Sequence, residues 1–150
     1  MTIKKGFTLI ELLVVIGIMA VLAAGVVALI NPLEKTRQAN DANVQNGVGQ
    51  VATSLQSYAA QQTTGIYPTT AQGLAHLVTT GELTALPAGV AFNYAGVGTT
   101  AVVSASLASA KYIQGSCAGV AAWWFWSSQN GRACGFCGAG APVLGSACAF

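Results

Sequence analysis

The sequence predicts an α+β protein in which a long N-terminal helix packs on a small antiparallel β-sheet head. The segment 7–30 is strongly apolar and its only charged residue is Glu11, which is typical of a helix that spans a membrane. Apolar residues then recur every three or four positions, as in an amphipathic helix. They are Val44, Val48, Val51, Leu55 and Tyr58. Short runs of strand-forming residues follow and predict the sheet.

The composition is that of an apolar and sparsely charged chain. Of its 150 residues, 53% are hydrophobic and only 7% are charged, and the formal net charge is +2. This length allows one domain with an appended segment. There is no cluster of Lys and Arg with interleaved aromatic residues, so the sequence predicts no nucleic-acid partner.

The segment 7–30 is long enough, at about 1.5 Å per residue, to cross a hydrocarbon core of about 30 Å. Lys4 and Lys5 precede it, and Pro32 follows it and is expected to end or kink the helix. A cleavable secretory signal would have a shorter apolar region, although Ala23–Gly25 is a passable cleavage site. A plain signal anchor fits the length.

A plain signal anchor does not explain Glu11. A carboxylate in a spanning helix raises the free energy of membrane insertion by about 3 kcal/mol at the centre of the helix, and by less near its end. The run from Lys4 to Ala24 resembles the signal sequence of type IV pilins and type II secretion pseudopilins. In that family a membrane peptidase cuts after the glycine that matches Gly6. It then N-methylates the new first residue, here Phe7, and leaves the apolar helix in place. The conserved glutamate of the family matches Glu11.

The resemblance implies a role for Glu11. Cleavage creates a positive amine on Phe7, and in the filaments of the family the glutamate compensates this charge within or between subunits. A buried ion pair is favourable only when both partners are present. Glu11 is therefore expected to set the register in which subunits dock.

The resemblance also implies location and partners. The chain would first be a single-pass prepilin in the inner membrane, surrounded by lipid and with its N-terminus in the cytoplasm, and then part of an extracellular or periplasmic filament. The expected partners are identical or related pilin subunits in a helical homo-oligomer, a prepilin peptidase, a platform protein and an assembly ATPase. The expected segments are a leader (1–6), a transmembrane or filament-core helix (7–31), its amphipathic continuation (32–62) and a globular head (63–150).

Turn signals predict a short helix after the long one. Thr69 or Thr70 can cap a helix that reaches about Thr79, and Gly81 can end it. His76 lies on this helix and is the only histidine of the chain. Because no second histidine or acid accompanies it, it is expected to be a surface or packing residue.

Three runs are typical of strands, namely Val90–Tyr94, Ala101–Leu107 and Val120–Gln129. The dipeptide Asn130-Gly131 tolerates positive φ at both turn positions, which predicts a two-residue hairpin. This hairpin would pair the third run with Arg132–Phe136. We therefore expect a sheet of three or four strands on the long helix.

The densest aromatic cluster of the chain is Trp123, Trp124, Phe125 and Trp126. On a strand, Trp124 and Trp126 would share one face, and Trp123 and Phe125 the other. We expect one core face and a covered second face. The alternative is an exposed aromatic patch for subunit contact, surface adhesion or a glycan ligand.

Four cysteines lie in the last third of the chain, at Cys117, Cys134, Cys137 and Cys148. An even number after an export-type segment favours disulfides, each contributing about 3 kcal/mol for a loop of about 15 residues. The C-x-x-C pair lacks a βαβ context for redox chemistry, and the spacing does not favour four-thiolate zinc. Three connectivities are open. Our preference pairs each C-x-x-C cysteine with one of the two others.

No catalytic constellation is present in the sequence. The four acids, Glu11, Glu34, Asp41 and Glu82, are scattered, and no phosphate-binding glycine loop or metal-ligand pair accompanies them. Some pseudopilins bind calcium through acids in C-terminal loops, but no acid follows Glu82 here. We therefore expect no enzyme activity, no cofactor and no metal.

The leading hypothesis is a structural subunit of a type IV pilus-like filament. A secretion pseudopilin or a minor pilin is the alternative within the same family. A membrane-anchored extracellular binding module is an alternative of a second class. A substitution of Gly6 separates the classes, because it would block processing of a pilin and leave a plain anchor unaffected.

Overall fold

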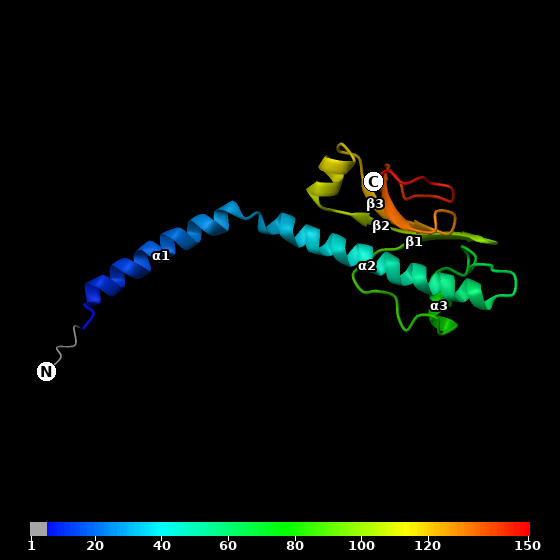
Figure 1. Cartoon of the computed structure of the whole chain (residues 1–150), viewed down its shortest axis with the longest axis horizontal. Helices are drawn as coiled ribbons and strands as arrows, with labels where there is room; N and C mark the ends of the chain where they lie inside the picture. The colour runs from blue at the N-terminus through cyan, green and yellow to red at the C-terminus, as the bar shows by residue number, and fades with distance from the viewer. Residues whose placement is uncertain (1–5) are drawn as a thin grey trace. The chain divides into compact units, whose positions relative to one another are not determined.

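A computed structural model describes residues 6–150, so that Lys4 and Lys5 lie outside the described residues. The described part forms two compact units, which divide between Lys35 and Thr36. The elements along the chain are α1 (Leu9–Leu29), α2 (Pro32–Gln61), α3 (Ala75–Thr79), β1 (Asn93–Val97), β2 (Thr100–Leu107), the π-helical turn η1 (Lys111–Ser116), β3 (Ala122–Ser127) and β4 (Ala133–Cys137) (Figure 1).

The helix is interrupted where the sequence places its proline. The first helix, α1, ends at Leu29, and Ile30 is extended, with φ −90° and ψ 113°. Pro32 then opens α2, where its missing N–H costs nothing because the first turn of a helix has no intrahelical acceptors. The side chain of Asn31 accepts a hydrogen bond from the backbone N–H of Glu34, at 3.2 Å, and so caps α2.

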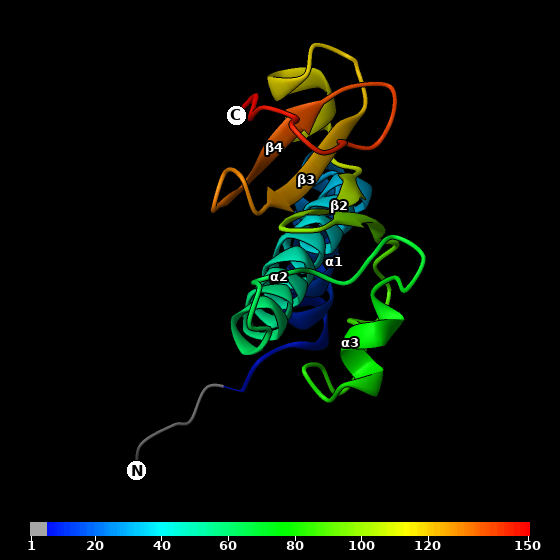
Figure 2. The same ribbon diagram turned by 90° about the vertical axis from the view of Figure 1, so that its right-hand side faces the viewer.

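The second unit is a four-stranded antiparallel sheet, in the order β1-β2-β3-β4, that packs on α2. Figure 2 shows the strands over one side of the helix and the C-terminal loop, in red, on the opposite face of the sheet. This architecture confirms the predicted α+β fold. Each strand pairs with the next one along the chain, through short loops between β1 and β2 and between β3 and β4, and through a longer connection that contains η1 between β2 and β3.

The apolar stripe of α2 faces the sheet and forms the larger core. Val48, Val51 and Leu55 are fully buried. They pack with the residues of β2 and β3 that point toward the helix, including Val103 and Trp126. Burial of side chains of this size contributes about 1.5–3 kcal/mol each.

Gly47 shows how closely a loop approaches α2. A Cβ at this position would lie 3.2 Å from the ring of Phe92 and 3.5 Å from Val90. The glycine therefore serves close packing of the segment before β1 against the helix. This packing also explains a shift in the first strand, which was predicted at Val90–Tyr94. Val90 and Phe92 act as loop residues that cover α2, and pairing begins only at Asn93.

The outer face of the sheet has a smaller core of its own. Phe125 is fully buried there and packs with Val102, Cys134 and Leu144. The alternation predicted for the aromatic run is confirmed, because Trp124 and Trp126 belong to the inner core and Phe125 to the outer. The expected covered second face is thus present.

The chain itself covers both edges of the sheet. Beside β1, the N–H of Tyr67 donates to the carbonyl of Gly98 at 2.9 Å, and the hydroxyl of Tyr94 donates to the carbonyl of Pro68 at 2.6 Å. Edge strands with free backbone groups invite pairing with other chains. The segment before α3 removes that possibility at β1.

Beside β4, the last residues of the sequence form a short clamp. The N–H of Gly135 donates to the carbonyl of Phe150 at 2.9 Å, and the N–H of Ala149 donates to the carbonyl of Gly135 at 2.8 Å. The Phe150 ring stacks on Tyr112 with centroids 5.6 Å apart. It occupies the space that a side chain at position 135 would need.

Two disulfides fasten this region, Cys117–Cys137 and Cys134–Cys148, with Cα atoms 5.3 and 5.7 Å apart. Positions 134 and 137 are three apart on one strand, so their side chains point to opposite faces. Accordingly Cys117 belongs to the inner core and Cys134 to the outer core. One disulfide therefore lies on each face of β4.

The predicted two-residue hairpin at Asn130-Gly131 is wrong. The pairing of β3 with β4 stops at Trp126 and Ala133, which leaves a wider loop. Gly131 has φ 64°, but Asn130 does not have a positive φ. The side chain of Ser127 accepts a hydrogen bond from the N–H of Asn130 at 3.2 Å, and this bond stabilises the wider turn.

Candidate processing and assembly site

The predicted cleavage bond lies in an exposed segment ahead of α1. Gly6, Phe7 and Thr8 are not helical, and the helix begins at Leu9. A Cβ at Gly6 would meet nothing within 4 Å. The fold therefore gives no reason for glycine at this position, and any requirement for it comes from recognition by another molecule.

Thr8 and Glu11 form a capping box at the start of α1. The N–H and the hydroxyl of Thr8 both donate to Oε2 of Glu11, each at 2.9 Å, and the N–H of Glu11 donates to Oγ1 of Thr8 at 3.3 Å. The carboxylate thus satisfies backbone and side-chain donors of the first turn. It also lies at the positive end of the helix dipole.

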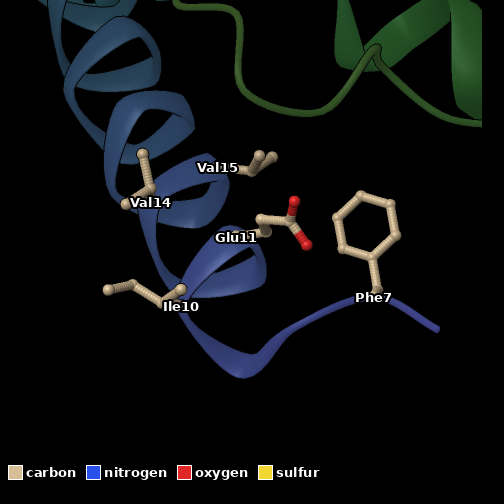
Figure 3. A pocket seen from close by; sticks show the side chains of 5 residues that line it. All are labelled: Phe7, Ile10, Glu11, Val14 and Val15. Atoms are coloured by element: carbon tan, nitrogen blue, oxygen red, sulfur yellow. The ribbon is translucent and has the colours of Figure 1, made fainter. Parts of the chain in front are cut away.

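The same carboxylate borders an apolar hollow of about 350 Å³. Its lining residues are Phe7, Ile10, Glu11, Val14 and Val15 (Figure 3). Figure 3 shows the Glu11 carboxylate directed toward the side on which the Phe7 ring lies. One acceptor in an apolar hollow suits a group that brings a positive charge and an apolar body. In the uncleaved chain Phe7 N is a peptide nitrogen, and cleavage would make it an amine.

The surface of α1 has no covering within the described structure. The stretch Leu9–Val27 has a mean hydropathy of 2.7, and none of it is buried. By length and composition this is the one helix among residues 6–150 that is able to cross a membrane. It fits a single-pass, membrane-anchored protein, whose apolar side chains contact lipid or other helices.

Three residues predicted from the sequence, Gly6, Phe7 and Glu11, meet at the start of α1. Pro32 lies at the start of α2, and the four cysteines belong to the second unit. Sequence reasoning missed Thr8, although its spacing of three from Glu11 is the signature of a capping box.

Neither a cluster of metal ligands nor His76 forms part of this site among residues 6–150. Within residues 6–150 no three His, Cys, Asp or Glu side chains converge as metal ligands. His76 Nε2 lies 3.2 Å from the hydroxyl of Tyr58, and the two rings meet edge to face. The histidine therefore packs between α3 and α2.

Residues 1–27 match the family model described as prokaryotic N-terminal methylation motif. This motif is the prepilin signature of type IV pilins and pseudopilins. No curated protein and no solved structure matches the chain.

Proposed function

We propose that the chain is the structural subunit of a type IV pilus-like filament, cleaved after Gly6, N-methylated at Phe7 and assembled through α1. The observation that carries the proposal is the helix itself, which exposes every described side chain and holds one carboxylate at its start. A filament core of packed α1 helices would cover this surface. The motif at residues 1–27 supports the processing step.

The composition of α1 supports a role for a charge pair in setting the register in which subunits dock. A helix that leaves lipid for a helical core exchanges one apolar environment for another, so apolar burial supplies little of the selectivity. A carboxylate in that core is costly unless a positive group meets it. The amine created at Phe7 would have the required charge. The Glu11 carboxylate lies near it, since it already accepts a hydrogen bond from the N–H of Thr8, the residue that follows Phe7.

The covered sheet edges of the head support the proposal that subunits assemble through α1 and not by strand addition. Strand addition needs a free sheet edge. Residues 67–70 cover β1 and residues 149–150 cover β4, with backbone hydrogen bonds in both places. The exported head would then be carried on the filament surface with its sheet already complete.

The first test separates the charge of Glu11 from its capping role. Glu11→Gln keeps an acceptor for Thr8 and a good capping-box side chain but loses the charge. We expect both Glu11→Gln and Glu11→Ala to be processed normally, and filament yield to fall about tenfold or more in each. Thr8→Ala, which removes the cap and keeps the charge, should lower the yield much less. Normal filament yield from Glu11→Gln would remove the proposed charge role.

The second test concerns processing. Because the space around Gly6 is open, Gly6→Ala leaves the fold intact, and its effect reports recognition by the prepilin peptidase. Unprocessed chain is expected to accumulate in the membrane. In the wild type, processed chain found only in membranes would identify a pseudopilin or a minor subunit. Abundant processed chain in surface filaments would identify a major pilin, whose assembly is expected to need a platform protein and an ATPase.

A further inference from the structure

Two members of the aromatic run on β3, Trp123 and Trp124, are only half-buried. Phe125 is fully buried and Trp126 is 3% exposed. The indole N–H of Trp123 donates to the carbonyl of Gly138 at 3.0 Å. Trp124 packs against the inner core but stays half-buried, so part of its ring is available at the surface.

Trp124 lines a cleft of about 310 Å³ together with Phe150 and Arg132. Trp124 lies opposite Gly135 on the neighbouring strand, and the Phe150 ring lies over that glycine. The cleft thus has two aromatic residues from distant parts of the sequence. Its volume is at the small end of the range for ligand pockets, about 300–1,000 Å³.

Arg132 supplies polar donors to this cleft. It is exposed, and it has no hydrogen bond or ion pair with any residue among 6–150. A guanidinium offers five N–H donors in a fixed planar fork. None of the residues that line the cleft has an acidic side chain to pair with that fork.

The cleft is held in shape before any ligand arrives. The disulfide Cys134–Cys148 forms one wall, and the backbone bonds between Gly135 and Phe150 fix the tail that carries the second ring. Walls fixed in this way lose little conformational entropy on binding, which favours a small ligand with few contacts.

We propose that this cleft is a carbohydrate site, in which a sugar ring packs against Trp124 and Phe150 and accepts hydrogen bonds from Arg132. Aromatic residues with a polar handle suit ligands that are apolar on one face and polar at the rim. The site goes beyond assembly, since it gives the exported head a ligand of its own.

A nucleic acid fits the cleft less well. Single strands are bound by a groove of several cations with successive stacking rings. Here one unpaired cation borders the cleft, and Lys111 is engaged with the ring of Tyr112, at 5.0 Å from its centroid. The sugar is therefore the ligand class that the donors and rings match.

The test uses the full-length protein in a detergent without a sugar headgroup. It is applied to immobilised neutral polysaccharides (glucan, mannan, galactan) and to uronic-acid polysaccharides (alginate, hyaluronan). We expect saturable retention on at least one of them, weakened about tenfold or more by Arg132→Ala, which is equivalent to about 1.4 kcal/mol. Retention on neutral polymers would mean that Arg132 binds hydroxyls, and retention only on uronic-acid polymers that it binds a carboxylate.

The matched control is Arg37→Ala, which removes an exposed arginine of α2 that does not line the cleft and should bind as the wild type does. Trp124→Leu should also weaken retention, with the fold checked by circular dichroism because this ring contacts the core. Equal retention by wild type and Arg132→Ala, or no retention on any polysaccharide, would overturn the proposal. Stronger Arg132-dependent retention on immobilised single-stranded oligonucleotide would overturn it too, in favour of a nucleic-acid site.

Discussion

The carboxylate of Asp41 on α2 accepts a hydrogen bond from the backbone N–H of Ala108, at 2.7 Å. Its second oxygen accepts from the N–H of Ser109 at 3.0 Å. Asp41 is 2% exposed, and the two amides lie just after β2, at the entrance to η1. One side chain thus ties the helix to the loop between β2 and β3, and replaces the partners that both amides would otherwise find in water.

Removal of the Asp41 carboxylate is expected to destabilise the head. Asp41→Ala leaves the buried N–H of Ser109 and the part-buried N–H of Ala108 without their acceptor, and should lower the free energy of unfolding by about 3 kcal/mol. Asp41→Asn keeps one acceptor and should cost about half as much. Denaturant unfolding of the full-length protein in detergent measures both. Asn46→Ala, at an exposed position of the same helix, is the control and should have little effect on stability. An effect of Asp41→Ala as small as that of Asn46→Ala would contradict the role assigned to the Asp41 carboxylate.

The absence of a side chain at Gly135 is expected to be necessary for the tail. A Cβ at this position would overlap the Phe150 ring, so Gly135→Ala should cost about 1–3 kcal/mol of stability. Phe150→Ala in the same chain should relieve part of that cost, because the clash disappears. Gly140→Ala, where a Cβ meets nothing within 4 Å, is the control. Strictly additive effects of the two changes would contradict the contact.

Two buried serines are expected to respond in opposite ways to loss of their hydroxyls. Ser104 Oγ has no hydrogen-bond partner among the described residues, so Ser104→Ala should be neutral or slightly stabilising. Ser127 Oγ accepts from Asn130, so Ser127→Ala should cost about 1 kcal/mol. Thermal unfolding compares the pair. A larger loss from Ser104→Ala than from Ser127→Ala would mean that the Ser104 hydroxyl has a partner.

Tyr94 is expected to make the head sensitive to alkali. Burial, with smaller contributions from Tyr58 and Tyr67, raises the pKa of Tyr94 above its ordinary value of 10.0. The folded protein therefore keeps this proton at a pH where the unfolded chain has lost it, and stability falls as the pH rises above about 10. Tyr94→Phe should lessen this fall.

The measurement is the free energy of unfolding from neutral pH to about pH 11. At neutral pH, Tyr94→Phe should be less stable by about 1 kcal/mol, since it loses the bond to the carbonyl of Pro68. Burial also raises the pKa of Tyr67, so Tyr67→Phe should remove a further part of the alkaline loss. An unchanged pH dependence in Tyr94→Phe would contradict the assigned burial.

Local patterns in the sequence predicted the elements well because their causes are local. The spacing from Val44 to Leu55 gave the buried face of α2, and the alternation at Trp123–Trp126 gave the two faces of β3. The N-terminal methylation motif at residues 1–27 was recognisable for the same reason, since it is a short contiguous pattern.

Features that depend on distant partners could not be predicted in this way. In the sequence Asp41 is one of four scattered acids, because the N–H groups of Ala108 and Ser109 come close to it only in the folded chain. The place of Phe150 over Gly135 depends equally on the folded edge of β4. The turn at Asn130-Gly131 was predicted wrongly for a local reason, since the side chain of Ser127, three residues before Asn130, stabilises a wider loop than the dipeptide favours by itself.

The central claim is that the chain is processed at Gly6 and assembled as a filament. Its most direct test is mass spectrometry of the protein from cells that contain an active prepilin peptidase, on sheared surface filaments and on membranes in parallel. The proposal predicts a filament subunit whose first residue is N-methylated Phe7 and whose four cysteines are all oxidised. A chain that retains its N-terminus from Met1 in such cells would contradict it.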